Sequence, residues 1–322
     1  LESVAVLALS TSPRARRESE LISAGAAEAT IEAVAESAGR RIEMFIRLTR
    51  QGERTQKTIR VDGVTRRAVD LPGEIRATLF WPEDLSLVKG GPEHRRRFLN
   101  EMLVQVVAGH GRLLAGYRRV LEQRNHLLKR ISAGQEGTLS LDVWNEKLVT
   151  LADSITSDRR AALEQLAPLA AAVHRTVSDG EAMTVTYLGP PPDLGEALAR
   201  AVGEDIRRGA TSLGPHRDDL LITIEGSDGR SFASQGQQRT AVVSLKLAES
   251  DLIEARSGER PVLLLDDVLS ELDLSRRGAL LERVGDSGQV IVTSVEADPF
   301  PPALMQSANV HTISGGRVDS CG

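Results

Sequence analysis

The sequence is poor in cysteine and in aromatic residues, and it has no long apolar run. Its one cysteine, Cys321, has no partner within the 322 residues, which excludes an internal disulfide and a cysteine-based metal site. Aromatic residues make up 3% of the chain, too few for the stacked rings of a dedicated single-strand binder. No apolar run approaches the ~18 residues that cross a bilayer. We therefore expect a cytoplasmic protein without a membrane segment.

Acidic charge dominates the chain, but basic charge is concentrated in one segment. The formal net charge of -5 argues against a protein that coats nucleic acid over its whole surface. Between Lys89 and Arg130, however, ten Lys and Arg accompany three Glu. Composition leaves two interpretations open, a solvated helical face or a set of contacts to DNA phosphates.

Hydrophobic spacing changes along the chain. Alternation predicts strands within 30–69, with an Asp-Gly hairpin turn at 62–63, and a further strand at 75–81. Beyond Pro92 the spacing becomes three to four residues, which predicts two long antiparallel helices separated by a turn at 132–137. The first of these helices would be ~30 Å long.

The C-terminal part alternates between helices and apolar strands. Strands at 261–265 and 289–293, separated by a helix at 275–284, predict a parallel sheet that is covered on both faces. We therefore predict an α/β head formed by 1–90 and 181–322, with a helical arm at 91–180 inserted into it. A helix predicted at 194–208 falls in the head by this division.

The strongest chemical pattern is an apolar strand that ends in Asp266 and Asp267. Ligands bind at the carboxyl ends of parallel strands, and a Walker-B Asp at such an end holds Mg²⁺ on a nucleotide. Taken alone, the pattern fits a core strand followed by a solvated Asp pair equally well. The Ser-Glu-Leu-Asp sequence at 270–273 favours the nucleotide interpretation, because a D-loop follows this strand in ABC ATPases.

A second pattern, Ser-Gln-Gly-Gln-Gln-Arg at 234–239, stands directly before a predicted helix. Free backbone N–H groups at a helix N-terminus form a phosphate cradle, as in the ABC signature. The six residues alone fit a Gln-rich turn and helix cap. The order of signature, Walker B and D-loop favours the functional interpretation.

Longer stretches resemble the RecF family of bacterial DNA-repair ATPases, which are SMC-like members of the ABC class. The resemblance covers essentially the whole chain and is carried by 82–99, 123–125, 214–220, 233–240 and 264–280. One position departs, because Asn100 stands where the family usually has Asp. The resemblance implies an α/β fold of the ABC-type P-loop ATPase head with an inserted antiparallel helical arm, lobe II.

The resemblance also implies roles for individual residues. Asp266 would be the Mg²⁺ ligand, and Asp267 stands where most ABC ATPases carry a catalytic Glu, which implies slow hydrolysis. Implied nucleotide contacts are Ser234, Gly236, Gln237, Arg239, Asp273, Thr293 and Glu83. Glu83 could equally be a turn carboxylate that caps a helix. Implied DNA contacts are Lys89, Arg95, Arg96, Arg97, Arg118, Arg119 and Arg124.

The function implied by the resemblance is an ATP- and Mg²⁺-dependent switch in recombinational repair. Two heads would sandwich ATP as a homodimer that closes on double-stranded and gapped DNA and opens on hydrolysis. RecR and RecO would be its partners and RecA loading the outcome.

No P-loop motif, Gly-x-x-x-x-Gly-Lys-Ser/Thr, occurs in the 322 residues. We expect the chain to be part of a longer frame with the P-loop upstream of Leu1, so that this part alone binds ATP poorly. One alternative is a non-catalytic paralogue without a P-loop that binds DNA or a partner. Another is an ABC transporter subunit, which the long arm and the lack of a switch histidine disfavour.

His216, Asp218 and Asp219 are the remaining cluster of chemical interest. Side chains at i and i+2 do not face each other on a helix, and no other His or Cys is placed to complete a metal site. We predict that this cluster forms hydrogen bonds and salt bridges between the lobes.

Overall fold

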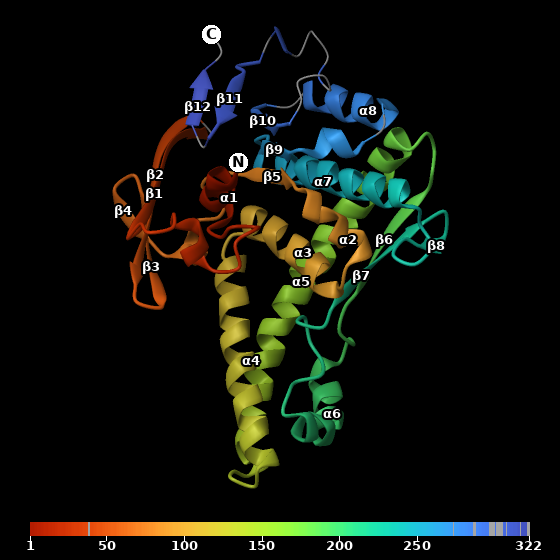
Figure 1. The fold of residues 1–322 in the computed structure, drawn as a ribbon. Helices are drawn as coiled ribbons and strands as arrows, with labels where there is room; N and C mark the ends of the chain where they lie inside the picture. Colours follow the sequence, from red (N-terminus) through yellow and green to blue (C-terminus); the bar gives the residue numbers. More distant parts are fainter. Residues whose placement is uncertain are drawn as a thin grey trace.

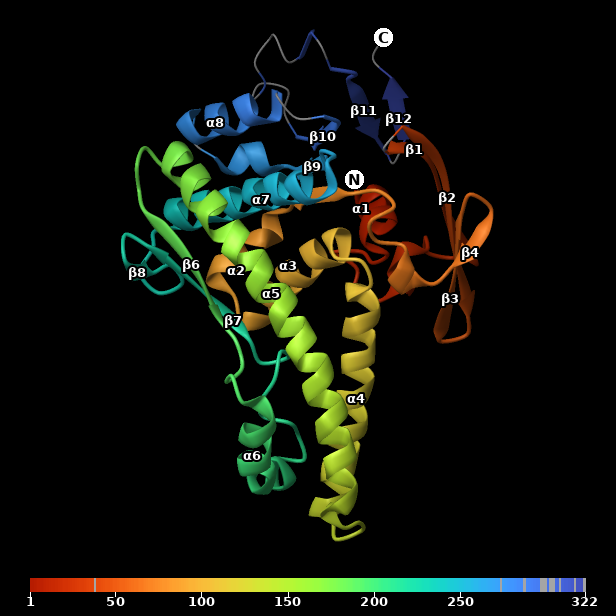
Figure 2. The same ribbon diagram turned by 180° about the vertical axis from the view of Figure 1, so that it is seen from behind.

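The fold was examined in a computed structural model of the chain (Figure 1). The structure describes residues 1–37, 39–272, 274–285, 288–295, 300, 305–306, 308–315 and 317–320. The sheets and most of the helices gather at one end as a head, and two long helices project from it (Figures 1 and 2). Among the described residues, every helix is too short or too polar to cross a bilayer.

The first part of the head is an antiparallel sheet. Its strands β1 to β4 follow each other in spatial order and span Glu28–Ser37, Arg40–Gln51, Arg54–Val61 and Val64–Arg66. Alternate residues of β2 are buried against helix α1 (Glu2–Leu9), among them Ile42, Met44 and Ile46. Asp62 and Gly63 both have positive φ, 50° and 75°, as the two central residues of a type I′ hairpin turn require. The predicted strands and turn are confirmed.

The second part is a parallel sheet in the order β10-β9-β5, formed by Val290–Thr293, Val262–Asp266 and Ala77–Phe80. Successive side chains of a strand point to opposite faces. Leu264 accordingly packs towards α1, whereas Leu263 and Leu265 pack towards α7 (Gln235–Ser257) and α8 (Leu274–Gly285). The predicted parallel sheet covered on both faces is confirmed.

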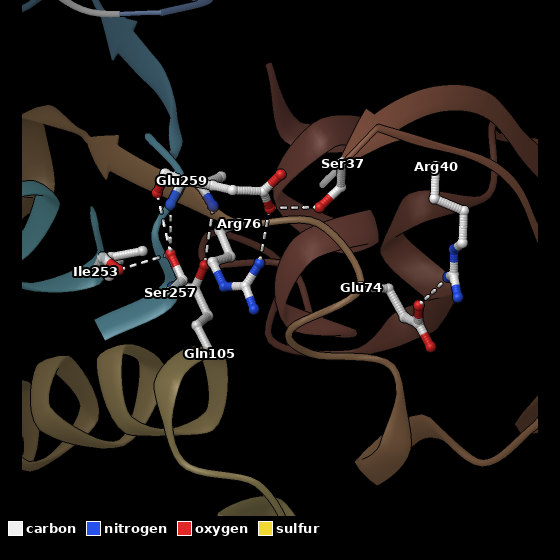
Figure 3. A network of polar contacts seen from close by, with 9 residues as sticks. Ser37, Arg40, Glu74, Arg76, Gln105, Ile253, Ser257 and Glu259 are labelled. Atoms are coloured by element: carbon white, nitrogen blue, oxygen red, sulfur yellow. Dashed lines mark hydrogen bonds and ion pairs between the residues drawn. The ribbon is translucent and has the colours of Figure 1, made fainter. Parts of the chain in front are cut away.

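Polar contacts fasten the two sheets to each other (Figure 3). Glu259, between α7 and β9, accepts a hydrogen bond from Ser37 at the end of β1, at 2.5 Å. The same carboxylate oxygen lies 3.2 Å from Nη1 of Arg76, which precedes β5. Ala77 donates its backbone N–H to Gln105 Oε1 at 2.8 Å, which ties helix α3 (Pro92–Val106) to β5. Glu259 therefore fixes the start of the strand that ends in Asp266.

The remaining elements complete the head and the arm. Those of the N-terminal half are η1 (Glu18–Leu21), η2 (Ala68–Asp70), η3 (Pro82–Leu85), α2 (Ser86–Lys89), α3 (Pro92–Val106), α4 (His110–Ser132), η4 (Thr138–Ser140) and α5 (Leu141–Val177). Those of the C-terminal half are β6 (Met183–Leu188), α6 (Leu194–Arg208), β7 (Asp219–Ile224), β8 (Ser227–Asp228), η5 (Val268–Glu271), β11 (His311–Ser314) and β12 (Arg317–Ser320). Strands β6, β7 and β8 form a separate antiparallel sheet.

Helices α4 and α5 form the projecting arm, as the helical spacing predicted. The 23 residues of α4 correspond to a length of about 35 Å. The predicted arm spans 91–180. Helix α6 packs on it through Leu194 and Leu198, whereas α3 and the second half of α5 pack into the head core with α7. A helical period identifies a helix but not the body on which its apolar face packs, so the packing groups α6 with the arm and α3 with the head, while the division at 91–180 stays a prediction.

Candidate nucleotide-binding and DNA-binding sites

Two adjacent parallel strands end side by side at one edge of the sheet. Thr293, the last residue of β10, is in register with Asp266, the last residue of β9. Thr293 Oγ1 donates a hydrogen bond to Asp266 Oδ1 at 2.6 Å, and the backbone N–H of Asp267 donates to the Thr293 carbonyl at 3.1 Å. The register thus brings three residues of the predicted nucleotide site together.

An arginine that the sequence analysis did not single out joins this group. Arg14 Nη1 lies 3.2 Å from Asp266 Oδ2, and Nη2 lies 3.8 Å from Glu83 Oε1. The guanidinium also stacks over the Trp81 ring, 5.4 Å from its centroid. Glu83 lies just beyond the end of β5, beside β9, so the sheet order explains its proximity to Asp266. Arg14 follows α1 in a loop, where no periodic pattern could have indicated its position.

Asp267 has a backbone conformation that is uncommon for a residue with a Cβ. Its φ of 52° lies in the left-handed region, which costs roughly 1–2 kcal/mol. Non-glycine residues held in this region concentrate at functional sites. The turn starts directly after Asp266, the last residue of β9.

The arrangement around Asp266 fits a magnesium ion that is shared with a nucleotide. Mg²⁺ prefers oxygen ligands and is usually held by one or two carboxylates together with phosphates and waters. The described part of the chain contains no group of three or more His, Cys, Asp or Glu that could enclose a metal by itself. A lone strand-end carboxylate that is oriented by a neighbouring hydroxyl, as Asp266 is by Thr293, suits the shared kind of site.

The predicted signature segment forms the start of α7. Ser234 is its N-cap, with Oγ accepting from the backbone N–H of Gln237 at 3.2 Å. In return the Gln237 Oε1 accepts from the Ser234 N–H at 2.9 Å, which completes a capping box. The first N–H groups of a helix have no partner within it, and Ser234 and Gln235 are exposed. The end of α7 can therefore receive an anion from outside the head.

Other residues of this segment are less accessible. A Cβ placed on Gly236 would lie 3.3 Å from Nη1 of Arg276, so α8 approaches this turn closely. Arg239 is partly buried one turn further along α7. Asp273, the last residue of the predicted D-loop, lies outside the described residues.

Two of the predicted DNA contacts are wrong. Arg95 is 4% exposed, and its Nε lies 2.5 Å from Asp219 Oδ1. Arg124 is fully buried, and its Nη1 lies 2.8 Å from Asp205 Oδ2. A buried guanidinium whose donors are taken by carboxylates within the fold cannot also reach a phosphate outside, so both residues are structural.

The other predicted DNA contacts remain at the surface to different degrees. Arg96 is partly buried and donates to the Asp218 carbonyl at 2.7 Å, while the exposed Arg97 pairs with Glu101 at 2.7 Å. Lys89, Arg118 and Arg119 are exposed, and in the part of the chain that the structure describes they form no ion pair. Arg118 and Arg119 on α4 are thus the most accessible basic pair of the predicted set.

The 214–220 segment joins the head to the arm, as predicted. Arg159 of α5 donates to the Pro215 carbonyl and to Asp218 Oδ2, both at 2.7 Å. His216 Nε2 lies 3.0 Å from the Thr211 carbonyl, which can only accept, so Nδ1 accepts from the Tyr117 hydroxyl of α4 at 2.7 Å. Burial lowers the pKa of His216 and raises the pKa of Tyr117. The predicted interlobe role of this cluster is confirmed.

Asn100, the position that departs from the family pattern, lies beside this cluster. Its Oδ1 accepts a hydrogen bond from Arg159 Nη2 at 3.0 Å. An amide oxygen serves this donor without adding a second carboxylate near Asp218. The departure therefore preserves the contact that Arg159 needs.

A parallel sheet with a carboxylate at its edge, a capped helix that opens to an anion and an inserted helical arm together define an ABC-class ATPase head of the SMC-like type. No family model matches the chain. Curated relatives, however, match almost all of it, and they show that the chain belongs to the RecF family.

Three of these relatives are called "DNA replication and repair protein RecF". The protein from Synechococcus sp. (strain JA-2-3B'a(2-13)) is 39% identical over 335 residues, which cover 99% of this chain and 87% of the relative. The Synechocystis sp. protein (strain ATCC 27184 / PCC 6803 / Kazusa) is 37% identical, with 99% and 88% covered. The Moorella thermoacetica protein is 36% identical, with 98% and 85% covered.

Solved structures agree. Two structures of the recombination mediator protein RecF in the RecFOR pathway cover 100% of this chain. The structure described as RecF-ATP has a TM-score of 0.88 at 29% identity and is covered to 87%. The one described as RecF-ATPrS has a TM-score of 0.87 at 28% identity and is covered to 88%. An Smc head from Pyrococcus yayanosii, with a TM-score of 0.52 at 13% identity, shares the fold alone.

Proposed function

We propose that the chain is the nucleotide-binding head of an ATP-dependent DNA-binding switch in recombinational repair. The observation that carries this proposal is the meeting of Glu83, Asp266 and Thr293 at one edge of the parallel sheet, in a chain of the RecF family. The related solved structures are described as RecF with ATP or ATPrS in the RecFOR pathway, which supports the same nucleotide and the same pathway here.

Each residue at this edge has a distinct role in the proposal. Asp266 holds the Mg²⁺, which supplies charge neutralisation to the phosphates when bound. Asp267 accepts the proton of the attacking water, and its short side chain makes hydrolysis slow, as suits a switch. Thr293 and Glu83 contact the nucleotide from the neighbouring strand ends.

The signature segment serves the nucleotide of a second copy. None of the side-chain partners found at Asp266 comes from 234–239. The N-terminus of α7 instead presents the N–H groups of Gln235 and Gly236, beside Ser234, to a γ-phosphate held by the partner head. Gln237, Arg239 and Asp273 belong to this contact. ATP thereby joins two heads as a homodimer.

DNA is bound by the exposed basic residues of the arm region. Arg118 and Arg119 on α4 carry most of this contact, with Lys89, Arg96 and Arg97 at the base of the arm. Such contacts reach phosphates and give sequence-independent, salt-sensitive binding to double-stranded and gapped DNA. The partners that the pathway name implies are RecR and RecO, with RecA loading as the outcome in the cytoplasm.

A DNA-binding titration with and without ATP tests this function. The protein is expressed from its complete natural reading frame, and a labelled gapped duplex is titrated at several salt concentrations. We expect at least tenfold tighter binding with ATP and Mg²⁺ than without nucleotide, about 1.4 kcal/mol of coupling. Equal affinity in both conditions contradicts the proposed switch.

A further inference from the structure

A chain of polar side chains connects the arm helix α5 to the signature segment. Glu181 follows the end of α5, and its Oε1 accepts a hydrogen bond from Gln237 Nε2 at 3.0 Å. The other end of the Gln237 amide, Oε1, accepts from the backbone N–H of Ser234 at 2.9 Å. One amide is therefore held at both ends, by Glu181 on the arm side and by Ser234 on the signature side.

The second oxygen of Glu181 faces a buried histidine. His174, in the last turn of α5, is fully buried, and its Nε2 lies 3.8 Å from Glu181 Oε2. Ser244 Oγ donates to the Thr240 carbonyl at 2.7 Å, so the 3.1 Å contact between His174 Nδ1 and Ser244 Oγ requires the hydrogen to be on Nδ1. The neutral ring then turns a lone pair towards the carboxylate, whereas the protonated ring offers it an N–H.

Other charges near His174 act in both directions. Burial lowers the pKa of His174, and Arg276 of α8 lowers it further, while Glu181 and Glu225 raise it. Arg276 is also the residue that a Cβ on Gly236 would approach at 3.3 Å. The charged groups near His174 are thus Arg276 on α8, Glu225 in the β7–β8 turn and Glu181 before β6. These three segments lie around the start of α7.

We propose that Glu181 is a positioning residue for the signature segment and that His174 sets the orientation of its carboxylate. The phosphate-binding consequence rests on the proposed function, but the positioning itself does not. With Glu181 in place, the Gln237 amide has one favourable orientation, with Oε1 towards Ser234. Without this acceptor the amide can rotate, and the capping box that holds the first turn of α7 loosens. Glu181 belongs to none of the segments in which the RecF resemblance was recognised.

Amide hydrogen exchange of the 233–240 segment tests the positioning in the nucleotide-free protein. We expect Glu181→Ala to speed exchange of the backbone N–H of Gln237 about fivefold, which is the factor that one ordinary hydrogen bond contributes. Glu181→Gln retains an acceptor oxygen and should stay within twofold of wild type, as should Glu164→Ala, the exposed control on α5. Wild-type exchange in Glu181→Ala overturns the proposal.

A pH series examines the histidine. Below the pKa of His174 the ring gains an N–H that Glu181 accepts. Exchange of the backbone N–H of Gln237, corrected for its intrinsic rate, should therefore slow as the pH is lowered through that pKa, which burial places below its ordinary value. His174→Gln should abolish this change. A slowing that persists in His174→Gln overturns the role of His174.

The functional consequence is measured separately, as ATP-driven dimerisation of the protein from its natural reading frame. Glu181→Ala should raise the ATP concentration for half-maximal dimer about fivefold, and Glu181→Gln should restore it. If wild type does not dimerise with ATP, the proposed function fails, while the exchange result still decides the role of Glu181.

Discussion

Arg95 and Arg118 are both arginines of the same basic segment, yet their surroundings give them opposite roles. The guanidinium of Arg95 is buried against Asp219, whereas that of Arg118 is exposed without an ion pair in the described structure. The desolvation of a buried charge must be offset by a partner, and a partner in another segment is invisible in a local sequence. The density of basic residues in the sequence therefore overestimated how many of them are accessible for contacts with DNA.

Asp266 and Asp267 have different proposed roles at the candidate nucleotide site, and a substitution separates these roles. Asp267→Asn should slow ATP hydrolysis about 10²-fold, because it removes the general base but leaves the Mg²⁺ ligand in place. ATP-induced association should persist and outlast that of wild type. Phosphate release and light scattering measure the two effects, and an unchanged hydrolysis rate would remove Asp267 from the mechanism.

At the DNA surface we expect the double variant Arg118→Glu/Arg119→Glu to weaken duplex binding for all sequences alike. The slope of log affinity against log salt should fall by about two, one for each lost phosphate contact. Arg200→Glu on α6 is the control, since Arg200 is exposed and pairs with Glu196. An unchanged slope in the double variant would place the DNA elsewhere.

Helix α5 is the element that packs in both the arm and the head. Its first half packs with α4 and α6 in the arm, and its second half packs with α7 in the head. Arg159, midway along it, reaches the 214–220 segment that joins the lobes. A displacement of the arm therefore bears directly on the helix that begins at the signature segment.

In the arm, the buried pair Arg124 and Asp205 locks α4 to α6. Arg124→Met should lower the free energy of unfolding by about 3–5 kcal/mol, because it leaves a buried carboxylate without its partner. Adding Asp205→Asn should recover part of this loss, since the neutral amide still accepts from the Ser212 N–H. Denaturant unfolding compares both with Arg119→Met, an exposed change on α4 that should stay within about 0.5 kcal/mol.

Local patterns predicted the elements well and their assembly less well. The Asp62-Gly63 turn and the alternation in β2 depend on neighbouring residues, as does the apolar run of β9, and all three were correct. The packing of α6 on the arm and the position of Arg14 beside Asp266 depend on contacts between residues far apart in the chain. No spacing within a single segment encodes these contacts, which is why neither the packing of α6 nor the position of Arg14 was predicted.

Across the whole molecule, buried and partly buried histidines make stability depend on pH. Burial lowers the pKa values of His110, His174 and His216 below 6.5, so the folded state favours their neutral forms. Above pH 6.5 both states are neutral and this stability is fully present. As the pH falls through 6.5 the unfolded chain binds more protons, and stability declines. We expect Tm to fall between pH 7 and pH 5, with a smaller fall in His216→Gln.

The central claim is that ATP joins two heads through the signature segment, and one measurement addresses it directly. Multi-angle light scattering gives the mass of wild type and of Ser234→Arg, from the natural reading frame, with and without ATP and Mg²⁺. Ser234→Arg removes the helix cap, a loss of about 1 kcal/mol that thermal unfolding will reveal, and it places a bulky side chain at the anion-facing end of α7. We predict that wild type becomes a dimer with ATP, whereas Ser234→Arg binds ATP equally well and stays a monomer. A Ser234→Arg dimer in ATP would contradict the account.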